Sequence, residues 1–242
     1  MNALIVLAHP EPTSFSAALK DVAAAALREE GYAVTVSNLY AEQFNPVAGR
    51  HDFESVCDAD RFHYQQEQLH AAQHGAFAAD IVREQRRVAE ADLFVFVYPL
   101  WWGGMPAILK GWFERVLAYG FAYADGQRFD RGYFKGRHGI EAISTGGTRE
   151  RFSAEGVYGD IDTLLYPHRR CMLEYVGLAT APTFVAYAAP RVSDDVRRQY
   201  LEDWARQVRA VAGLAHLSAS SADHPARAPA RIPDVKAWAQ AN

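Results

Sequence analysis

The sequence of 242 residues has few cysteines and no long apolar run. Its two cysteines, Cys57 and Cys171, stand far apart and in no spacing typical of a metal or redox site, which indicates buried or idle thiols in a reducing compartment. No apolar run approaches the roughly 18 residues that a membrane span needs. The N-terminus lacks the basic segment and the cleavage site of a signal peptide. We therefore expect a cytoplasmic protein with no membrane insertion.

Basic residues are not in excess either: 25 Lys and Arg face 29 Asp and Glu, for a net charge of −4. This balance argues against a nucleic-acid partner. Neither G-x-G-x-x-G nor a P-loop occurs, which weighs against those nucleotide sites, and the absence of G-x-S-x-G gives no support for a hydrolase. His70 and His74 have helical spacing but no apparent third ligand, so we expect no metal site.

Strand-like and helix-like segments alternate along the chain. Buried strands are expected at 3–10, 32–40, 92–100, 139–147 and 178–188. Helices are expected at 14–31, 64–74, 80–91, 107–120, 161–177 (kinked at Pro167) and 193–213. This order predicts an α/β fold with a doubly wound five-stranded parallel sheet in the order 2-1-3-4-5 and helices on both faces. We expect one domain over 1–212 and an extended tail over 213–242, whose Trp238 could dock on a neighbouring surface.

In that architecture ligands bind where strands one and three end. The turn after strand one offers His9 and the segment Thr13–Ser16 at a helix N-terminus, which suits a phosphate, although a capped helix without a ligand remains equally open. The turn after strand three is "PLWWGGMP", and the turn after strand four is "STGGTRE". Tryptophans supply apolar walls, while glycines let backbone N–H groups approach a ring edge. Together the three turns favour a flavin site.

The chain also resembles a known family at these residues. The strings "ALIVLAHPEPTSF", "PLWW", "PAILKGWFERVLAYGFAY", "STGG", "GVYGD" and "LEDW" are similar to the NAD(P)H:quinone oxidoreductase (DT-diaphorase-like) family of flavodoxin-like flavoproteins, over about residues 3–208. The resemblance implies a homodimer with FAD (alternatively FMN) at the subunit interface and NAD(P)H as co-substrate. It further implies two-electron, ping-pong hydride transfer through flavin N5 to a quinone, extending to azo or nitro compounds.

The resemblance also implies roles for individual residues. Those expected to bind the cofactor are His9, Ser14, Phe15, Ser16, His63, Pro99, Leu100, Trp101, Trp102, Thr145, Gly146, Gly147, Phe152, Asp194 and Arg197. Those expected to line the substrate pocket are Trp102, Gly103, Tyr123, Asp125, Tyr158 and Tyr175. Those expected to act in catalysis are Tyr158, Gly146 and Gly147. The pair Asp194 and Arg197, which favours FAD, also fits an ordinary first turn of a helix.

The chain departs from the family pattern in its pocket. Gly103 replaces an aromatic residue and Asp125 replaces a tyrosine. Phe152 and Tyr158 stand where the family has a Tyr and a His that steady charge on the reduced flavin. Phe152 can only pack, and a tyrosine hydroxyl is a poor proton relay at neutral pH.

Backbone N–H groups of the Gly146–Gly147 turn remain for that charge, and Arg149 or Arg151 could approach it. Activity should therefore persist, with a proton step that depends less on one titrating side chain. The alternative is a flavin-bearing ancillary subunit of a potassium efflux system. A one-electron carrier fits less well, because the second turn is apolar and no strongly acidic docking surface is present.

Overall fold

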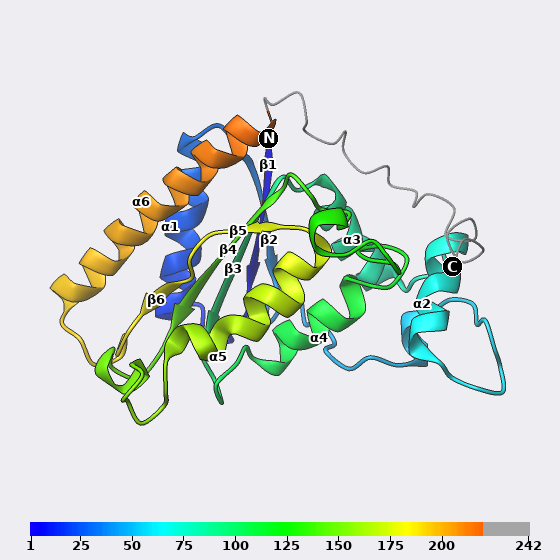
Figure 1. Cartoon of the computed structure of the whole chain (residues 1–242), viewed down its shortest axis with the longest axis horizontal. Helices are drawn as coiled ribbons and strands as arrows, with labels where there is room; N and C mark the ends of the chain where they lie inside the picture. Colours follow the sequence, from blue (N-terminus) through cyan, green and yellow to red (C-terminus); the bar gives the residue numbers. More distant parts are fainter. Residues whose placement is uncertain (220–242) are drawn as a thin grey trace.

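A parallel sheet forms the centre of the molecule in the computed structural model, which describes residues 1–219 (Figure 1). Its order is β2-β1-β3-β4-β5, with β6 also pairing with β4, so the predicted order is confirmed. The strands are β1 (Asn2–Leu7), β2 (Ala33–Asn38), β3 (Leu93–Pro99), β4 (His138–Ser144), β5 (Ala179–Thr180) and β6 (Phe184–Ala186).

Helices cover both faces of the sheet. They are α1 (Phe15–Glu29), α2 (Tyr64–His74), α3 (Ala79–Glu90), α4 (Ala107–Val116), α5 (Ile161–His168) and α6 (Asp194–Ala219). Short helical turns are η1 (Arg50–Asp52), η2 (Phe129–Arg131), η3 (Glu150–Phe152), η4 (Arg169–Leu173) and η5 (Glu174–Val176). Figure 1 shows α1 and α6 together on one face, and α3, α4 and α5 on the other. Among residues 1–219 no helix has the length and apolar character to cross a membrane.

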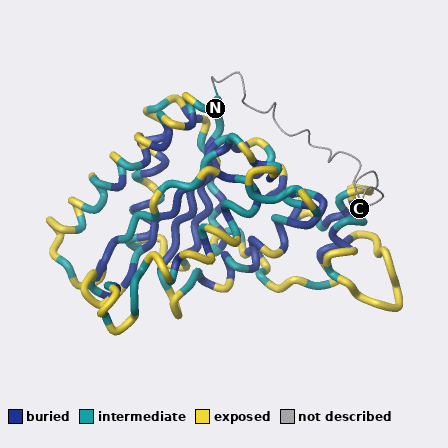
Figure 2. The backbone as a smooth tube through the Cα atoms, in the orientation of Figure 1, coloured by how far each residue is buried: buried dark blue, intermediate teal, exposed yellow. Residues whose placement is uncertain are grey.

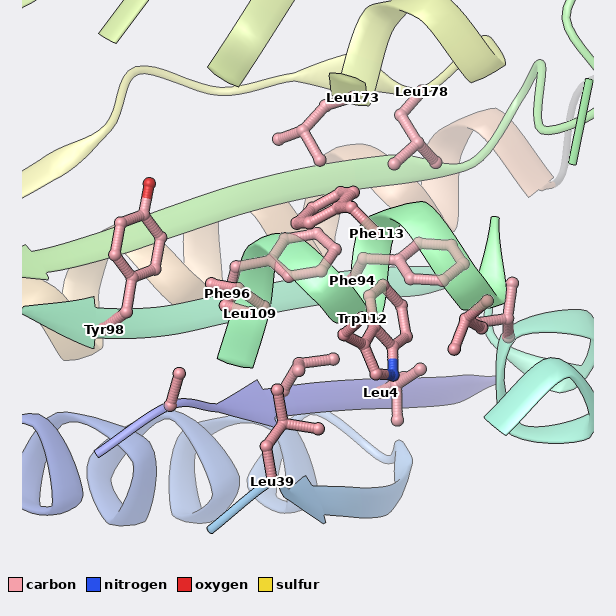
Figure 3. Packing of buried hydrophobic residues seen from close by; sticks show 14 of the residues in the cluster. Leu4, Leu39, Phe94, Phe96, Tyr98, Leu109, Trp112, Phe113, Leu173 and Leu178 are labelled. Carbon is pink, nitrogen blue, oxygen red and sulfur yellow. The ribbon is translucent and has the colours of Figure 1, made fainter. Parts of the chain in front are cut away.

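The main core consists of two apolar layers, one on each side of the sheet. Figure 2 shows that the strands between these layers are buried. Trp204 of α6 fills the first layer, and its indole N–H donates to the Leu19 carbonyl at 2.9 Å. Phe94 and Phe96 of β3 and Trp112 of α4 fill the second layer (Figure 3). Because side chains alternate along a strand, consecutive residues of β3 supply both layers, which is why that strand reads as a continuous apolar run.

Four expectations need correction. The segment predicted as a helix over 161–177 with a kink at Pro167 is α-helical only as far as His168; it then continues as the π-helical turn η4 and the short turn η5, and the change comes just after Pro167, which offers no N–H to the helical ladder. The fifth strand is split into β5 and β6 around Pro182, for the same reason. The helix predicted over 107–120 ends at Val116. Residues 213–219 continue α6, so an extended tail from 213 is wrong for them; Trp238 lies outside the described residues.

Neither cysteine is buried, so of the two expectations, buried or idle thiols, the first is wrong. Cys57 and Cys171 are both exposed, and no disulfide joins them. His70 and His74 lie side by side on α2, with ring centroids 4.3 Å apart, and the His70 ring lies 3.0 Å from the Ser55 hydroxyl. Within residues 1–219 no group of three metal-ligating side chains gathers.

Candidate flavin site

The turn after β1 leads into the N-terminus of α1, where two backbone N–H groups have no acceptor in the described residues. Ser14 is the N-cap of α1, and its hydroxyl accepts from the Ala17 N–H at 3.1 Å. The N–H groups of Phe15 and Ser16 have no acceptor within the described part of the chain. Because such groups carry the positive end of the helix dipole, this end of α1 suits an anionic group.

His9 adds a further donor at the same place. Its Nδ1 accepts from the Glu11 N–H at 3.0 Å, so the proton of the neutral ring belongs on Nε2. Burial lowers the pKa of His9, against the opposing influence of Glu11. The ring is therefore neutral at physiological pH and presents an N–H donor rather than a second charge.

The turn after β3 is a tight reversal from Trp101 to Gly104. These two residues exchange both backbone hydrogen bonds, each at 3.0 Å. Trp102 and Gly103 between them have φ of +52° and +71°, as in a type I′ turn. Gly103 therefore supplies conformational freedom, and the Gly104 N–H is already used within the turn, contrary to the expectation that it faces a ligand. The turn aims the Trp102 ring outward, where it is fully exposed.

The two glycines of the turn after β4 have different roles. The Gly146 N–H has no acceptor in the described residues, so it is available to a ligand. The Gly147 N–H donates to the Thr145 hydroxyl at 3.2 Å, so only one of the two predicted catalytic N–H groups is open. A Cβ on Gly147 would lie 2.4 Å from the Phe152 ring. Gly147 is thus needed so that Phe152 can pack beneath the turn.

These turns enclose two adjoining cavities. The helix cavity, of about 500 Å³, is lined by His9, Thr13, Ser14, Phe15, Ala18, Pro99, Leu100, Trp101, Ser144, Thr145, Gly146, Ala189, Pro190 and Arg197. The ring cavity, of about 490 Å³, is lined by Leu100, Trp102, Gly103, Thr145, Gly146, Gly147, Arg151, Phe152, Tyr158, Leu164 and Arg191. They share Leu100, Thr145 and Gly146, so one elongated ligand can occupy both.

Arginines give this elongated site a positive charge. Arg197 reaches the helix cavity; its guanidinium donates to the carbonyls of Ala189 (3.1 Å) and Val192 (2.6 Å) and pairs with Asp194. Arg151 and Arg191 line the ring cavity, and the Arg151 Nη1 lies 3.5 Å from the Tyr158 hydroxyl. Arg191 is not among the residues predicted from the sequence. The available signal was its position in the segment between the last strand, β6, and helix α6, at the edge of the sheet where the site lies.

Three predicted cofactor residues do not line either cavity with their side chains. The Ser16 hydroxyl is buried and lies 3.0 Å from the Ser144 hydroxyl. His63 is the exposed N-cap of α2, and Asp194 is an exposed residue that holds Arg197. Phe152 and Tyr158 do meet in the ring cavity, with ring centroids 4.9 Å apart, Phe152 buried and Tyr158 half exposed.

The remaining substrate residues gather elsewhere. Tyr123 and Tyr175 pack edge to face, with centroids 5.4 Å apart, and line a third cavity of about 600 Å³ between α4 and the η4 segment. Asp125 is close by and pairs with Arg128 at 2.6 Å. We call this the tyrosine cavity. Within one chain these residues do not join Trp102 and Tyr158, so the predicted substrate pocket is divided between two places.

The donors and walls fit a flavin nucleotide. Free N–H groups at the α1 N-terminus and the His9 donor suit phosphate oxygens, and Arg197 adds positive charge in the same cavity beside Ala189 and Pro190. The Gly146 N–H and the exposed Trp102 ring, with Phe152 below, suit a flat ring system that has polar edges. A fully exposed tryptophan held at positive φ packs against nothing in the free chain, which is the observation that indicates a missing aromatic surface.

The chain is similar to known proteins over most of its length. The model of the flavodoxin-like fold family matches residues 1–208. NAD(P)H dehydrogenase (quinone) 1 of Rattus norvegicus is 41% identical over 211 residues, which cover 87% of this chain and 77% of that protein. Ribosyldihydronicotinamide dehydrogenase (quinone) of Mus musculus is 39% identical over 209 residues, 86% of this chain and 90% of that protein.

Solved structures are similar as well. A protein of Klebsiella pneumoniae superposes with a TM-score of 0.83 at 33% identity, covering 87% of this chain and 85% of that one. The NAD(P)H:quinone oxidoreductase of Methanothermobacter marburgensis superposes with a TM-score of 0.69 at 26% identity, covering 87% and 96%.

Proposed function

This chain belongs to the flavodoxin-like family of NAD(P)H dehydrogenases (quinone), and from that premise we propose that it is a flavin-dependent NAD(P)H:quinone oxidoreductase. The observation that carries the proposal is the pair of adjoining cavities with phosphate donors at one end and an exposed tryptophan at the other. A bound flavin would accept hydride from NAD(P)H and pass it to the quinone. None of the relatives described above is a transport subunit, so the ancillary-subunit alternative has no support.

The chain's own residues hold the reactants. The α1 N-terminus and His9 bind phosphate, and the Gly146 N–H and Thr145 hold a polar ring edge. Trp102, Gly103 and Phe152 line the place where nicotinamide and quinone would stack. The absence of a side chain at Gly103 widens this place. Arg151 and Arg191 supply positive charge beside it, which favours a developing oxyanion on the acceptor.

The test is an anaerobic absorption spectrum of the flavin-loaded protein, before and after NADPH and then menadione. Bleaching by NADPH followed by return of colour with menadione supports the proposal. Flavin that stays oxidised after NADPH is added contradicts the proposal. Reoxidation of the bound flavin by menadione that is no faster than reoxidation of free reduced flavin also contradicts it. The family resemblance extends the acceptors to azo and nitro compounds, which the same assay measures.

We propose FAD rather than FMN as the cofactor. The helix cavity continues past the α1 N-terminus to Ala189, Pro190 and Arg197, which leaves room and charge for an adenylate half. Arg198 is a matched control, because it pairs with Asp195 at the same spacing but does not line the cavity. Arg197→Ala should weaken FAD binding about tenfold and FMN binding little, while Arg198→Ala changes neither. Equal losses of both flavins in Arg197→Ala would contradict this assignment.

We also propose a homodimer in which each substrate pocket takes residues from both chains. The support is that the ring cavity and the tyrosine cavity share no lining residue within one chain. Coexpression of Trp102→Ala chains with Tyr123→Ala chains tests this. If pockets are shared, a mixed dimer has one intact pocket and regains activity that neither variant has alone. Mixed dimers as inactive as the parents contradict sharing, and sedimentation reports the oligomeric state. We place the protein in the cytoplasm, where its two exposed thiols stay reduced.

A further inference from the structure

Three polar side chains from three elements meet inside the apolar layer next to the ring cavity. The Tyr98 hydroxyl of β3 donates to Glu141 Oε1 of β4 at 2.6 Å and lies 2.9 Å from His168 Nδ1 at the end of α5. All three residues are buried. In Figure 3 Tyr98 lies near the carboxyl end of β3, with its hydroxyl pointing toward β4. We call these residues the Tyr98 network.

The hydrogen bonds of the Tyr98 network permit two arrangements of protons. When Glu141 is ionised, the Tyr98 hydroxyl donates to it, and His168 Nδ1–H donates to the Tyr98 oxygen. When Glu141 is protonated, it donates to the Tyr98 oxygen, the Tyr98 hydroxyl donates to Nδ1, and the ring proton sits on Nε2. The two arrangements differ by one proton, and the His168 ring is neutral in both.

The surroundings of Glu141 place this exchange near neutral pH. Burial raises the pKa of Glu141 to about 7, against hydrogen bonds from Tyr98 and the Thr183 hydroxyl (3.4 Å) and the charge of Arg169, which lower it. Burial lowers the pKa of His168, which keeps its ring neutral. These are the titratable and charged groups that face Glu141: Tyr98 from β3, His168 and Arg169 from the α5–η4 segment, with Thr183 from the β5–β6 connection.

The far nitrogen of His168 lies beside the turn after β3, which borders the ring cavity. Its Nε2 lies 3.7 Å from the place where a Cβ of Gly104 would stand, and the preceding residue, Gly103, lines that cavity. Leu164, one turn earlier on α5, lines the same cavity. Across residues 1–219 the Nε2 atom has no hydrogen-bond partner. The ring cavity itself is lined by no histidine and no carboxylate among the described residues.

We propose that the Tyr98 network is a buried store of one proton, which delivers through His168 Nε2 the proton that quinone reduction consumes. The idea rests on the proposed function: NAD(P)H, a quinone and one proton give NAD(P)⁺ and a hydroquinone. In delivery, Glu141 gives its proton to the Tyr98 oxygen, the Tyr98 proton moves to Nδ1, and the Nε2 proton leaves toward the ring cavity. Glu141 is left ionised, and solvent later restores the store by the reverse path.

The first test reads the ring without any reaction. Nitrogen-15 NMR of the flavin-loaded, histidine-labelled protein distinguishes the two tautomers of a neutral imidazole. Between about pH 5 and pH 9, which brackets the midpoint near 7, the protonated nitrogen of His168 should change from Nε2 to Nδ1. Glu141→Gln and Tyr98→Phe should each abolish the change. A ring that keeps one tautomer throughout, or that titrates as an imidazolium in all three proteins, overturns the proposal.

The second test reads the proton step. In stopped-flow experiments the rate of reoxidation by menadione should show a pH inflection near 7. The inflection should persist in Tyr158→Phe and disappear in Glu141→Gln. Glu141→Gln should also reoxidise at least about tenfold more slowly than the unmodified protein below the inflection. Gly104→Ala places a methyl in contact with Nε2; it should slow reoxidation while leaving the tautomer change intact. Glu202→Gln, an exposed site on α6, is the control.

The outcomes of the two tests are separable. If reoxidation is the same in Glu141→Gln and in the unmodified protein at every pH, the network does not serve the reaction and the proposal falls. If menadione is not reduced by any variant, the proposed function fails, and delivery to a quinone fails with it. The tautomer titration then decides alone whether the network stores a proton.

Discussion

Replacing Glu141 by glutamine should change how the stability of the protein depends on pH. The buried carboxyl has a pKa of about 7 in the folded chain, whereas an unfolded chain gives glutamate a value near 4.5. Between these values the folded state holds a proton that the unfolded state has released. The stabilisation is therefore fully present below about pH 4.5 and is lost as the pH rises through 7. Glutamine keeps the shape and the hydrogen bond with Tyr98 but cannot ionise.

The size of the effect follows from the difference in pKa. About 2.5 pKa units at 1.36 kcal/mol each correspond to about 3 kcal/mol in the free energy of unfolding between pH 4.5 and pH 8. For a domain of this length that is roughly 6–12 °C in melting temperature. The lowered pKa of His168 acts in the opposite direction, because its stabilisation is lost as the pH falls below about 6.5. Comparing the two proteins at each pH cancels this contribution.

Urea unfolding followed by tryptophan fluorescence, at half-unit steps from pH 5 to pH 8.5, measures the difference. We expect Glu141→Gln to be less stable than, or equal to, the unmodified protein at pH 5 and more stable at pH 8. Glu202→Gln should follow the unmodified protein throughout, because Glu202 is exposed. Parallel curves for the unmodified protein and Glu141→Gln would refute the reasoning, since they would mean that the buried carboxyl titrates as it does in water.

Three further substitutions test the geometry of the site and the core. Trp102→Gly removes an exposed ring held at positive φ, so the free energy of unfolding should change by less than about 1 kcal/mol while the flavin dissociation constant rises about tenfold, measured by flavin fluorescence. Gly147→Ala would place a methyl 2.4 Å from the Phe152 ring; it should weaken flavin binding, and adding Phe152→Leu should partly restore it. Gly111→Ala would place a methyl 2.1 Å from the Pro46 carbonyl oxygen, so urea unfolding should show a loss of about 2–3 kcal/mol, despite the gain of about 1 kcal/mol in helix propensity. A stability equal to that of the unmodified protein would mean that the Pro46 loop moves away freely.

Much of the fold could be read from local patterns. The apolar run at β3, the Ser14 cap of α1 and the helix at Tyr64–His74 are determined by neighbours in sequence, and the structure has them there. The sheet order followed because right-handed crossovers leave few topologies for alternating strands and helices. The three turns at one edge of the sheet followed from that order. Hydrophobic periodicity predicted the wrong element bounds near Pro167 and Pro182. Proline has no backbone N–H to donate, so it interrupts the hydrogen bonding of a helix or strand even where the apolar pattern continues.

Which atoms face the site was decided only by the tertiary structure. Sequence placed both glycines of the "STGG" turn against a ligand, but Thr145 takes one N–H and Phe152 takes the space of one side chain. Ser16 lies beside the site in sequence, yet its hydroxyl turns inward to Ser144. Neighbouring residues of a helix or turn point their side chains in different directions, so one contacts a ligand while the next contacts the core. The packing of the folded chain decides which residue does which.

The Tyr98 network shows the same limit most clearly. A glutamate within "GIEAIS" and a tyrosine at the end of "DLFVFVYPL" are the only local signs of it, and each also fits an edge of an apolar strand. Tyr98 lies 43 residues from Glu141 and 70 from His168 along the chain, and only the pairing of β3 with β4 and the packing of α5 over them bring the three together. Hydrophobic periodicity determines which elements form and which faces they bury. The pKa of a buried carboxyl depends on what lies within a few ångströms, and for contacts this distant in sequence that is a property of the folded chain.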